Sequence, residues 1–130
     1  MAVKYKVVSK RPGGMAGENA PRYYPIVTDR EMMDLDQICD YISENLQMHS
    51  AHVKGVLETF TRVVPTLLKN GHNVRLDGFG TFSLHVSGKG QDTPDKVTSR
   101  DITGIKMAFL PDKRIKQALR STHFEKSKKN

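Results

Sequence analysis

The sequence predicts an α+β fold in which two helices are flanked by strands. Apolar residues recur at helical spacing between residues 34 and 71, whereas residues 3–7 alternate apolar and basic side chains, as a half-buried strand does. A glycine- and phenylalanine-rich run at residues 78–82 indicates a further strand with a tight bend. We expect a β extension at residues 1–30, a main domain at 31–122 and a basic tail at 123–130.

The extension is predicted to be a two-stranded ribbon. Its second strand, residues 23–28, contains Pro25, which lacks a backbone donor and therefore favours the edge of a sheet. Because a two-stranded ribbon is marginally stable alone, we expect it to join the main sheet or to pack on its helices. The lysines of the first strand have two open roles, namely contact with phosphates or solvation of an exposed edge.

The first helix is predicted to begin after Asp34, which can cap it together with Gln37 three residues later. Cys39 lies on the apolar face of this helix and is interpreted as a core residue. That face consists of Leu35, Ile38, Cys39, Ile42 and Leu46.

The second helix is predicted to begin near Ser50 and to end at Asn70-Gly71. Pro65 is expected to kink it, or to mark an earlier end. Its apolar stripe is nearly continuous, and the two helices together carry more apolar surface than one hairpin can hide. We therefore expect a partner subunit. The stripe comprises Val53, Val56, Leu57, Phe60, Val63, Val64, Leu67 and Leu68.

Two motifs follow the helices. Gly78-Phe79-Gly80-Thr81-Phe82 combines glycines for close backbone approach with rings that a small chain would bury. Ala108-Phe109 and Asp112-Lys113-Arg114-Ile115-Lys116 follow about two dozen residues later, and the polar segment between, with Pro94, reads as a long protruding hairpin.

These residues, in this order, resemble the bacterial histone-like HU and IHF family over roughly residues 34–120. The resemblance implies a helical hairpin, a three-stranded antiparallel sheet with a protruding β-arm, a short C-terminal helix and an intertwined dimer. It further implies that two arms embrace DNA, with a proline at each tip wedged between base steps. The implied dimer core is Phe60, Phe79, Phe82 and Phe109, and the implied DNA-binding residues are Arg75, Lys89, Pro94, Lys96, Arg100, Lys106, Lys113, Arg114, Lys116 and Arg120.

The chain departs from the family pattern at two places. The arm holds three basic residues against Asp92, Asp95 and Asp101, so it is neutral where the family's arm is rich in Arg and Lys. Asp112 also replaces the glycine that precedes the family's basic helix. Fewer phosphate contacts weaken binding and flatten its salt dependence, so DNA binding is better supported than intercalation by Pro94.

Charge is distributed unevenly along a chain whose formal net charge is +7. Residues 1–30 carry +4, residues 31–60 carry −5, residues 61–90 carry +3 and residues 91–130 carry +5. An acidic segment between basic flanks predicts a polarised surface that attracts polyanions, although a solvated basic surface without a partner gives the same pattern.

The residue types predict neither an enzyme nor a metal or cofactor site. The five histidines and the single Cys39 show no spacing that would gather zinc ligands, and no nucleophile, base and orienting group occur together. We expect no small-molecule substrate. No apolar run is long enough for a membrane span, and the first residues lack a signal-peptide pattern, so a cytoplasmic protein is expected. The resemblance to the HU and IHF family further implies that it is associated with the nucleoid.

The sequence thus predicts a non-catalytic, largely sequence-nonspecific, architectural DNA-binding homodimer that prefers distorted or bendable duplexes. The alternative, from a different class, is an HU-fold scaffold that binds another protein and has weak or lost DNA binding. RNA as the ligand and pairing with a different homologue both stay open.

Overall fold

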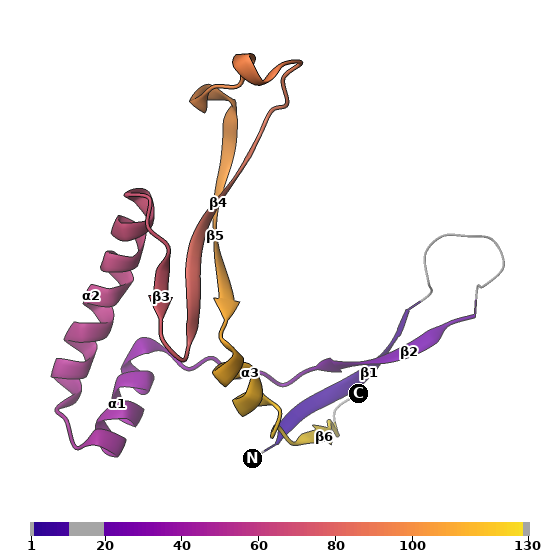
Figure 1. Ribbon diagram of the computed structural model, residues 1–130. Helices are drawn as coiled ribbons and strands as arrows, with labels where there is room; N and C mark the ends of the chain where they lie inside the picture. Colours follow the sequence, from indigo (N-terminus) through magenta and orange to yellow (C-terminus); the bar gives the residue numbers. More distant parts are fainter. Residues whose placement is uncertain (1, 11–19, 129–130) are drawn as a thin grey trace. The chain divides into compact units, whose positions relative to one another are not determined.

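The computed structural model describes residues 2–10 and 20–128, and the chain divides into two units (Figure 1). One unit consists of residues 34–119, and the other combines residues 1–33 with residues 120–130. Each has its own three-stranded sheet, and the first unit also has a helical hairpin. The predicted α+β fold with a helical hairpin and an antiparallel sheet is therefore confirmed.

Helix α1 (Leu35–Leu46) begins where the sequence predicts. The Asp34 carboxylate accepts a hydrogen bond from the Gln37 N–H at 2.9 Å, and the Gln37 side chain accepts one from the Asp34 N–H at 3.0 Å. This reciprocal capping satisfies two donors that a helix start otherwise leaves unpaired. An ion pair of 2.9 Å between Lys54 and Asp36 ties α1 to the second helix.

Helix α2 (Ser50–Lys69) runs through Pro65, so an early end at this proline was the wrong alternative. His49 caps its start through Nδ1, which accepts from the Ala51 N–H at 3.3 Å. At its end Gly71 has a φ of +89°, and the N–H groups of Gly71 and His72 donate to the carbonyls of Leu68 and Leu67. This pattern is a Schellman motif, and it confirms the predicted end.

Strands β3 (Val74–Leu76), β4 (Gly80–Gly88) and β5 (Ile102–Pro111) form the antiparallel sheet of this unit. Gly78, with a φ of +80°, lies in the turn between β3 and β4, where the Phe79 N–H donates to the Leu76 carbonyl. A Cβ at Gly80 would lie 2.5 Å from the Phe109 ring and 2.6 Å from the Leu110 carbonyl oxygen, so the close approach of β4 to β5 requires glycine here.

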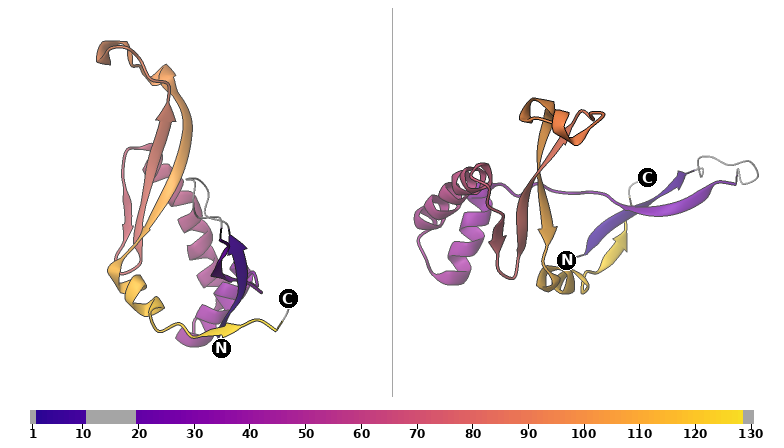
Figure 2. Two further views of the ribbon diagram at one scale, coloured as in Figure 1. Left: turned by 90° about the vertical axis from the view of Figure 1, so that its right-hand side faces the viewer. Right: turned by 45° about the horizontal axis from the view of Figure 1, so that its top comes forward.

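The β4–β5 hairpin projects as a long arm, with its strands side by side up to the tip (Figure 2). The ladder extends to the Gly88–Ile102 pair, after an irregularity between Ser87 and Gly88. Beyond it the chain forms two 3-10 turns at the end of the hairpin, η1 (Pro94–Lys96) and η2 (Ser99–Asp101).

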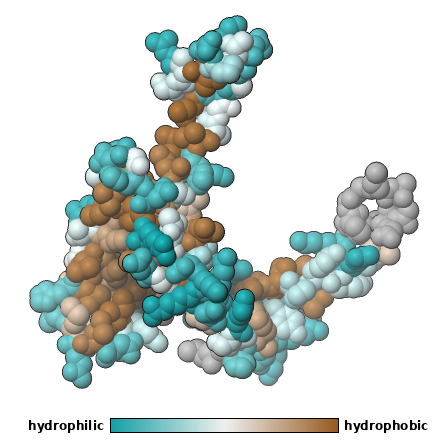
Figure 3. Space-filling model, viewed as in Figure 1, coloured by the Kyte–Doolittle hydropathy of each residue, from teal (hydrophilic) through white to brown (hydrophobic). Residues whose placement is uncertain are grey.

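The helical hairpin has a thin core. Among the described residues, the buried hydrophobic side chains are Cys39, Val53, Val64 and Leu68. Much of the predicted stripe stays open, since Val56 is 67% exposed and Val63 is 42% exposed. Figure 3 shows apolar residues gathered at the surface along the helices and along the arm.

The second unit contains β1 (Val3–Lys10), β2 (Arg22–Val27) and β6 (Phe124–Lys126), in the order β2-β1-β6. The β1–β2 ribbon with Pro25 on an edge strand is as predicted. Joining the main sheet, one of the two expected alternatives, was wrong, because the described strands form two separate sheets. Strand β6 was not anticipated; it pairs parallel with β1 inside the segment expected to be a basic tail.

Several bonds tie β6 into this sheet. Lys4 forms an ion pair of 2.8 Å with Glu125, and Val3 N–H donates to the His123 carbonyl. Ser127 donates through its N–H to the Tyr5 carbonyl and through its hydroxyl to Asp29. Residues 124–126 therefore form an integral strand of the second unit.

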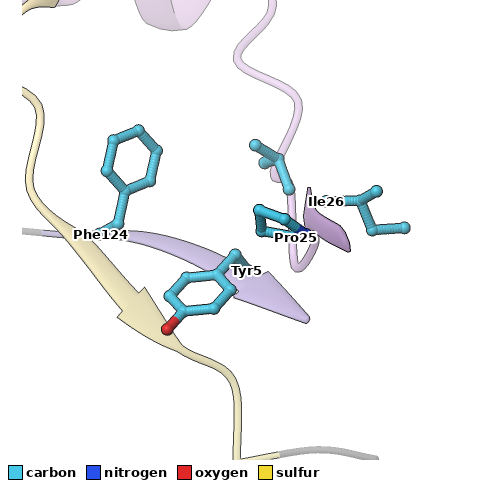
Figure 4. Close-up of a pocket in the computed structure, with 5 residues that line it drawn as sticks. Tyr5, Pro25, Ile26 and Phe124 are labelled. Atoms are coloured by element: carbon cyan, nitrogen blue, oxygen red, sulfur yellow. The ribbon is translucent and has the colours of Figure 1, made fainter. Parts of the chain in front are cut away.

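The two faces of this sheet differ in character. By register, Tyr5, Val7, Pro25 and Val27 share one face with Phe124, whereas the lysines of β1 point to the other. The apolar face contains a hollow of about 400 Å³, around which Tyr5, Pro25 and Phe124 are arranged (Figure 4). Among the described residues, no helix is long and apolar enough to cross a lipid bilayer.

Candidate nucleic-acid interface

Helix α3 (Lys113–Leu119) carries three of the predicted cations, Lys113, Arg114 and Lys116. It starts directly after β5, and Asp112 caps it: the carboxylate accepts from the Lys113 N–H at 2.9 Å, while the Asp112 carbonyl accepts from the Lys116 N–H at 3.1 Å. The aspartate that departs from the family's glycine thus stabilises the first turn of the basic helix.

The turn between β3 and β4 lies against this helix. The Phe79 carbonyl accepts from the Asp112 N–H at 2.8 Å, which joins the turn to the start of α3. A Cβ at Gly78 would lie 2.7 Å from Arg114 Nη1, so the guanidinium group rests on the turn. The structure therefore brings Arg114 next to the Gly-Phe-Gly motif, a proximity that the sequence spacing did not reveal.

The sheet of this unit has one polar face. Register places Arg75 opposite Thr81 and Lys106 opposite His85, and all four share the face with Ser83. The ring of His85 lies in hydrogen-bond contact with Ser83 Oγ at 3.0 Å, and Arg75 forms an exposed ion pair with Asp77 at 3.3 Å. Sequence reasoning identified Arg75 and Lys106 but missed His85 and Ser83, which the alternation of β4 could have indicated.

The opposite face of the sheet is aromatic. Phe82 packs on Phe60 of α2 with ring centroids 6.3 Å apart, and on Phe109 at 4.9 Å. Phe79 contacts Phe109 at 5.1 Å. The four phenylalanines predicted as a dimer core thus form one cluster, yet Phe79 is 42% and Phe109 is 39% exposed.

The remaining predicted residues of the arm, Lys89, Pro94, Lys96 and Arg100, lie at its tip. With about 3.3 Å per residue, β4 places this tip roughly 26 Å from Gly80. Pro94 is the first residue of η1, between Asp92 and Asp95.

Asp101 organises the tip. Its carboxylate accepts from the Gln91 side chain at 3.0 Å and from the Thr98 N–H at 2.9 Å, and its carbonyl accepts from the Lys89 N–H. One of the three arm carboxylates therefore has a structural role.

Arg120 and Cys39 complete the residues that the sequence singled out. Arg120 belongs to the unit that contains β6, so it is grouped separately from the α3 cations. Cys39 is only 2% exposed, and burial raises the pKa of its thiol, which favours the neutral form and fits the predicted core role.

Comparison with known proteins gives the following relatives. The profile of the HU-HIG family, described as an HU domain fused to a wHTH, Ig or glycine-rich motif, matches residues 1–126. DNA-binding protein HU-alpha from Vibrio cholerae is 31% identical over 90 residues, which cover 68% of this chain and 100% of that protein. Integration host factor subunit alpha from Actinobacillus succinogenes is 33% identical over 48 residues, 37% of this chain and 49% of the relative.

Two solved structures share the fold. A candidate bacterial DNA-binding protein from Bacteroides vulgatus has a TM-score of 0.71 at 14% identity, over 96% of this chain and 48% of the other. This chain therefore spans only about half the length of that protein, as it does for the integration host factor subunit. Anabaena HU, from a cocrystal with DNA, has a TM-score of 0.53 at 17% identity, over 68% of this chain and 99% of HU.

These relatives confirm the resemblance deduced from the Gly-Phe-Gly-Thr-Phe motif and its downstream partners. HU and IHF proteins are non-catalytic, which confirms the expectation that this chain is not an enzyme. Because the family profile matches nearly the whole sequence, the chain belongs to the HU-HIG family.

Proposed function

We propose that this protein is an architectural DNA-binding protein that acts as a homodimer and recognises duplex shape more than sequence. The observation that carries the proposal is the combination, in one HU-like unit, of a polar sheet face, an adjoining basic helix and a protruding arm. The relatives named DNA-binding protein HU-alpha and the Anabaena HU–DNA cocrystal support the same function.

Dimerisation is proposed because one chain leaves its aromatic cluster open. Phe79 and Phe109 are about two-fifths exposed, and Met107, on the same face of β5 as Phe109, is 55% exposed. Burying apolar surface contributes about 25 cal/mol per Å², so a second copy that covers these side chains would gain substantial free energy. The predicted dimer core of four phenylalanines is thus retained as a proposal.

The proposed phosphate contacts come from Arg75, Lys106, Lys113, Arg114 and Lys116. These side chains are positioned by the sheet and by α3 instead of by flexible loops. Contacts of this kind orient a protein on the duplex without reading its bases, so little sequence preference is expected. Sites that bend easily should be preferred, as should DNA that is already distorted. A location in the nucleoid follows from this proposal.

The arm tip is assigned a weaker role. Pro94 is apolar and rigid, as a wedge between base steps must be, but Asp92 and Asp95 flank it and repel phosphates. We therefore retain Lys89, Lys96 and Arg100 as peripheral contacts. Strong kinking by Pro94 is not expected.

The test is fluorescence anisotropy with a linear duplex and with a four-way junction of the same composition, each over a series of salt concentrations. We expect tighter binding to the junction and a log–log salt slope of about −0.9 for each phosphate contact. The variant Lys113→Ala/Lys116→Ala should flatten the slope by about 1.8 while its melting temperature stays unchanged, because both side chains lie on an exposed helix surface.

A protein-binding scaffold is the second candidate function, and the neutral arm favours it. The same experiment separates the two. If neither DNA binds near physiological salt, the DNA-binding proposal fails and the scaffold is favoured. If the wild-type protein and the double variant bind DNA equally well, Lys113 and Lys116 are not part of the interface, but the DNA-binding function is retained.

A further inference from the structure

The two units of the chain divide its charge very unequally. Residues 34–119, the HU-like unit, contain 11 Lys/Arg and 10 Asp/Glu, a net charge of only +1. Residues 1–33 and 120–130 contain 10 Lys/Arg and 4 Asp/Glu, a net charge of +6 in about half as many residues. The excess positive charge therefore lies in the unit that HU itself does not have.

Within this second unit the strand pattern sorts the cations onto one face. Lys4, Lys6 and Lys10 occupy even-numbered positions of β1 and share a face with Val8. The register places Arg22, Tyr24 and Ile26 of β2 on the same side, with Arg22 opposite Lys10. Lys6 and Lys10 are exposed and, at about 3.3 Å per residue, roughly 13 Å apart along the strand. Lys4 is already neutralised by Glu125, so Lys6 and Lys10 are the lysines of β1 with the clearest capacity for an external anion.

The opposite face of the same sheet is apolar and contains the hollow between Tyr5, Pro25 and Phe124. Apolar faces of antiparallel sheets are normally packed against protein, while the other face meets solvent. The lysine face is therefore the one that this sheet is suited to present outward. Several cations held on one face of a fixed sheet complement the repeated phosphates of a nucleic acid better than an isolated carboxylate.

We propose that this lysine face of β1, centred on Lys6 and Lys10, is a second contact surface for the phosphate backbone of duplex DNA. It supplies a large part of the electrostatic attraction that the nearly neutral HU-like unit lacks. This inference rests on the proposed DNA-binding function and adds to it a surface that the HU fold does not contain.

The test compares full-length variants by anisotropy on the same duplex from 50 to 200 mM NaCl. Lys6→Gln/Lys10→Gln removes two cations from the proposed face, and two lost phosphate contacts should flatten the salt slope by about 1.8. Over this fourfold range in salt, the double variant should lose about 12-fold less affinity than the wild-type protein does. Thermal melting is measured alongside, and exposed Lys→Gln changes should leave it unchanged.

A matched pair of single variants distinguishes DNA binding by the lysine face from a general effect of net charge. Lys6 and Lys126 lie in the same sheet, but the register places Lys126 beside Tyr5 on the apolar side. We expect Lys6→Gln to flatten the slope by about 0.9 and Lys126→Gln to leave it near the wild-type value. Equal effects of the two variants would overturn the proposed face in favour of net charge alone.

The outcomes also separate this inference from the function on which it rests. If the wild-type protein binds DNA and Lys113→Ala/Lys116→Ala weakens it, but Lys6→Gln/Lys10→Gln does not, the second surface is rejected and the DNA-binding function remains. If the wild-type protein does not bind duplex DNA, both are rejected. A Lys6→Gln/Lys10→Gln protein that loses binding to duplex RNA but not to DNA would reassign the face to RNA.

Discussion

Asp112 occupies a position where helix capping and DNA binding make opposite demands. Its carboxylate accepts from the Lys113 N–H and so stabilises the start of α3. The same negative charge stands beside Lys113 and Arg114, which are proposed to meet phosphates. A glycine, the residue that the family pattern has here, would give up little capping energy and would remove the repulsion.

Substitution of Asp112 separates these two effects. Asp112→Ala should lower the free energy of unfolding by about 1 kcal/mol, whereas Asp112→Gly should lower it by only a few tenths. Both changes remove a negative charge that repels the phosphates of DNA, and each should tighten DNA binding by about 1.5- to 5-fold. Urea unfolding and anisotropy measure the two quantities, and an Asp112→Ala protein as stable as the wild type would show that the capping bond contributes nothing.

Individual residues also show which features could be predicted from the sequence and which could not. Asp34 with Gln37 and Asn70 with Gly71 were identified as helix ends because capping depends on neighbours within a few residues. The contact of Arg114 with the Gly78 turn joins residues far apart in sequence, and no local pattern encodes it. His85 and Ser83 fall between, since strand alternation places them on the polar face once the strand is known.

At the scale of elements, the long helices were predictable and the short strand β6 was not. Its three residues are too few to show a period, and its pairing partner β1 lies at the other end of the chain. The arm tip is similar: the sequence predicted a hairpin that contains Pro94, but the two 3-10 turns depend on the bonds of Asp101 to Gln91 and Thr98.

The ion pair between Lys4 and Glu125 should make the docking of β6 sensitive to acid. The Lys4 ammonium group lowers the pKa of Glu125 below its ordinary value of 4.5. The pair therefore stabilises the folded sheet above pH 4.5, and this contribution is lost as the pH falls through the lowered pKa. Both side chains are partly exposed, so the effect on stability is small and is best observed locally.

The measurement is an NMR titration of the Ser127 amide, whose N–H donates to the Tyr5 carbonyl across the β1–β6 pair. We expect this resonance to shift toward its unfolded position below pH 4.5 while amides of α2 stay unchanged. Glu125→Gln should remove the pH-dependent step. A step of the same size in that variant would assign the transition to another group.

At the scale of the whole molecule, one chain does not bury the aromatic cluster that holds its HU-like unit together. The rings contact one another in the pairs Phe60–Phe82, Phe82–Phe109 and Phe109–Phe79. The rings of Phe109 and Phe79 nevertheless remain partly exposed to solvent. The sequence indicated that one chain leaves apolar surface uncovered, because the apolar stripe of its second helix is nearly continuous. The partner that covers it is beyond what local patterns encode.

Phe79→Ala should therefore act through assembly. If a second copy buries this ring, the substitution should cost about 3–5 kcal/mol, and the variant should be monomeric at concentrations where the wild-type protein is dimeric. Light scattering and the dependence of melting temperature on protein concentration check both points. Val97→Ala is the control, because Val97 is 55% exposed but lies at the arm tip. A wild-type protein that is monomeric at all concentrations would contradict the proposed homodimer.

The parallel pairing of β1 with β6 has a consequence for the order of folding. Val3 and Phe124 lie about 120 residues apart in sequence, whereas the contacts of α1 with α2 and of β4 with β5 are far more local. Closing so long a loop is entropically costly and slow. During synthesis on a ribosome, the HU-like unit can fold before β6, the third strand of the β1–β2 sheet, has been made. The hollow between Tyr5, Pro25 and Phe124 would then be completed last, after residues 124–126 have emerged.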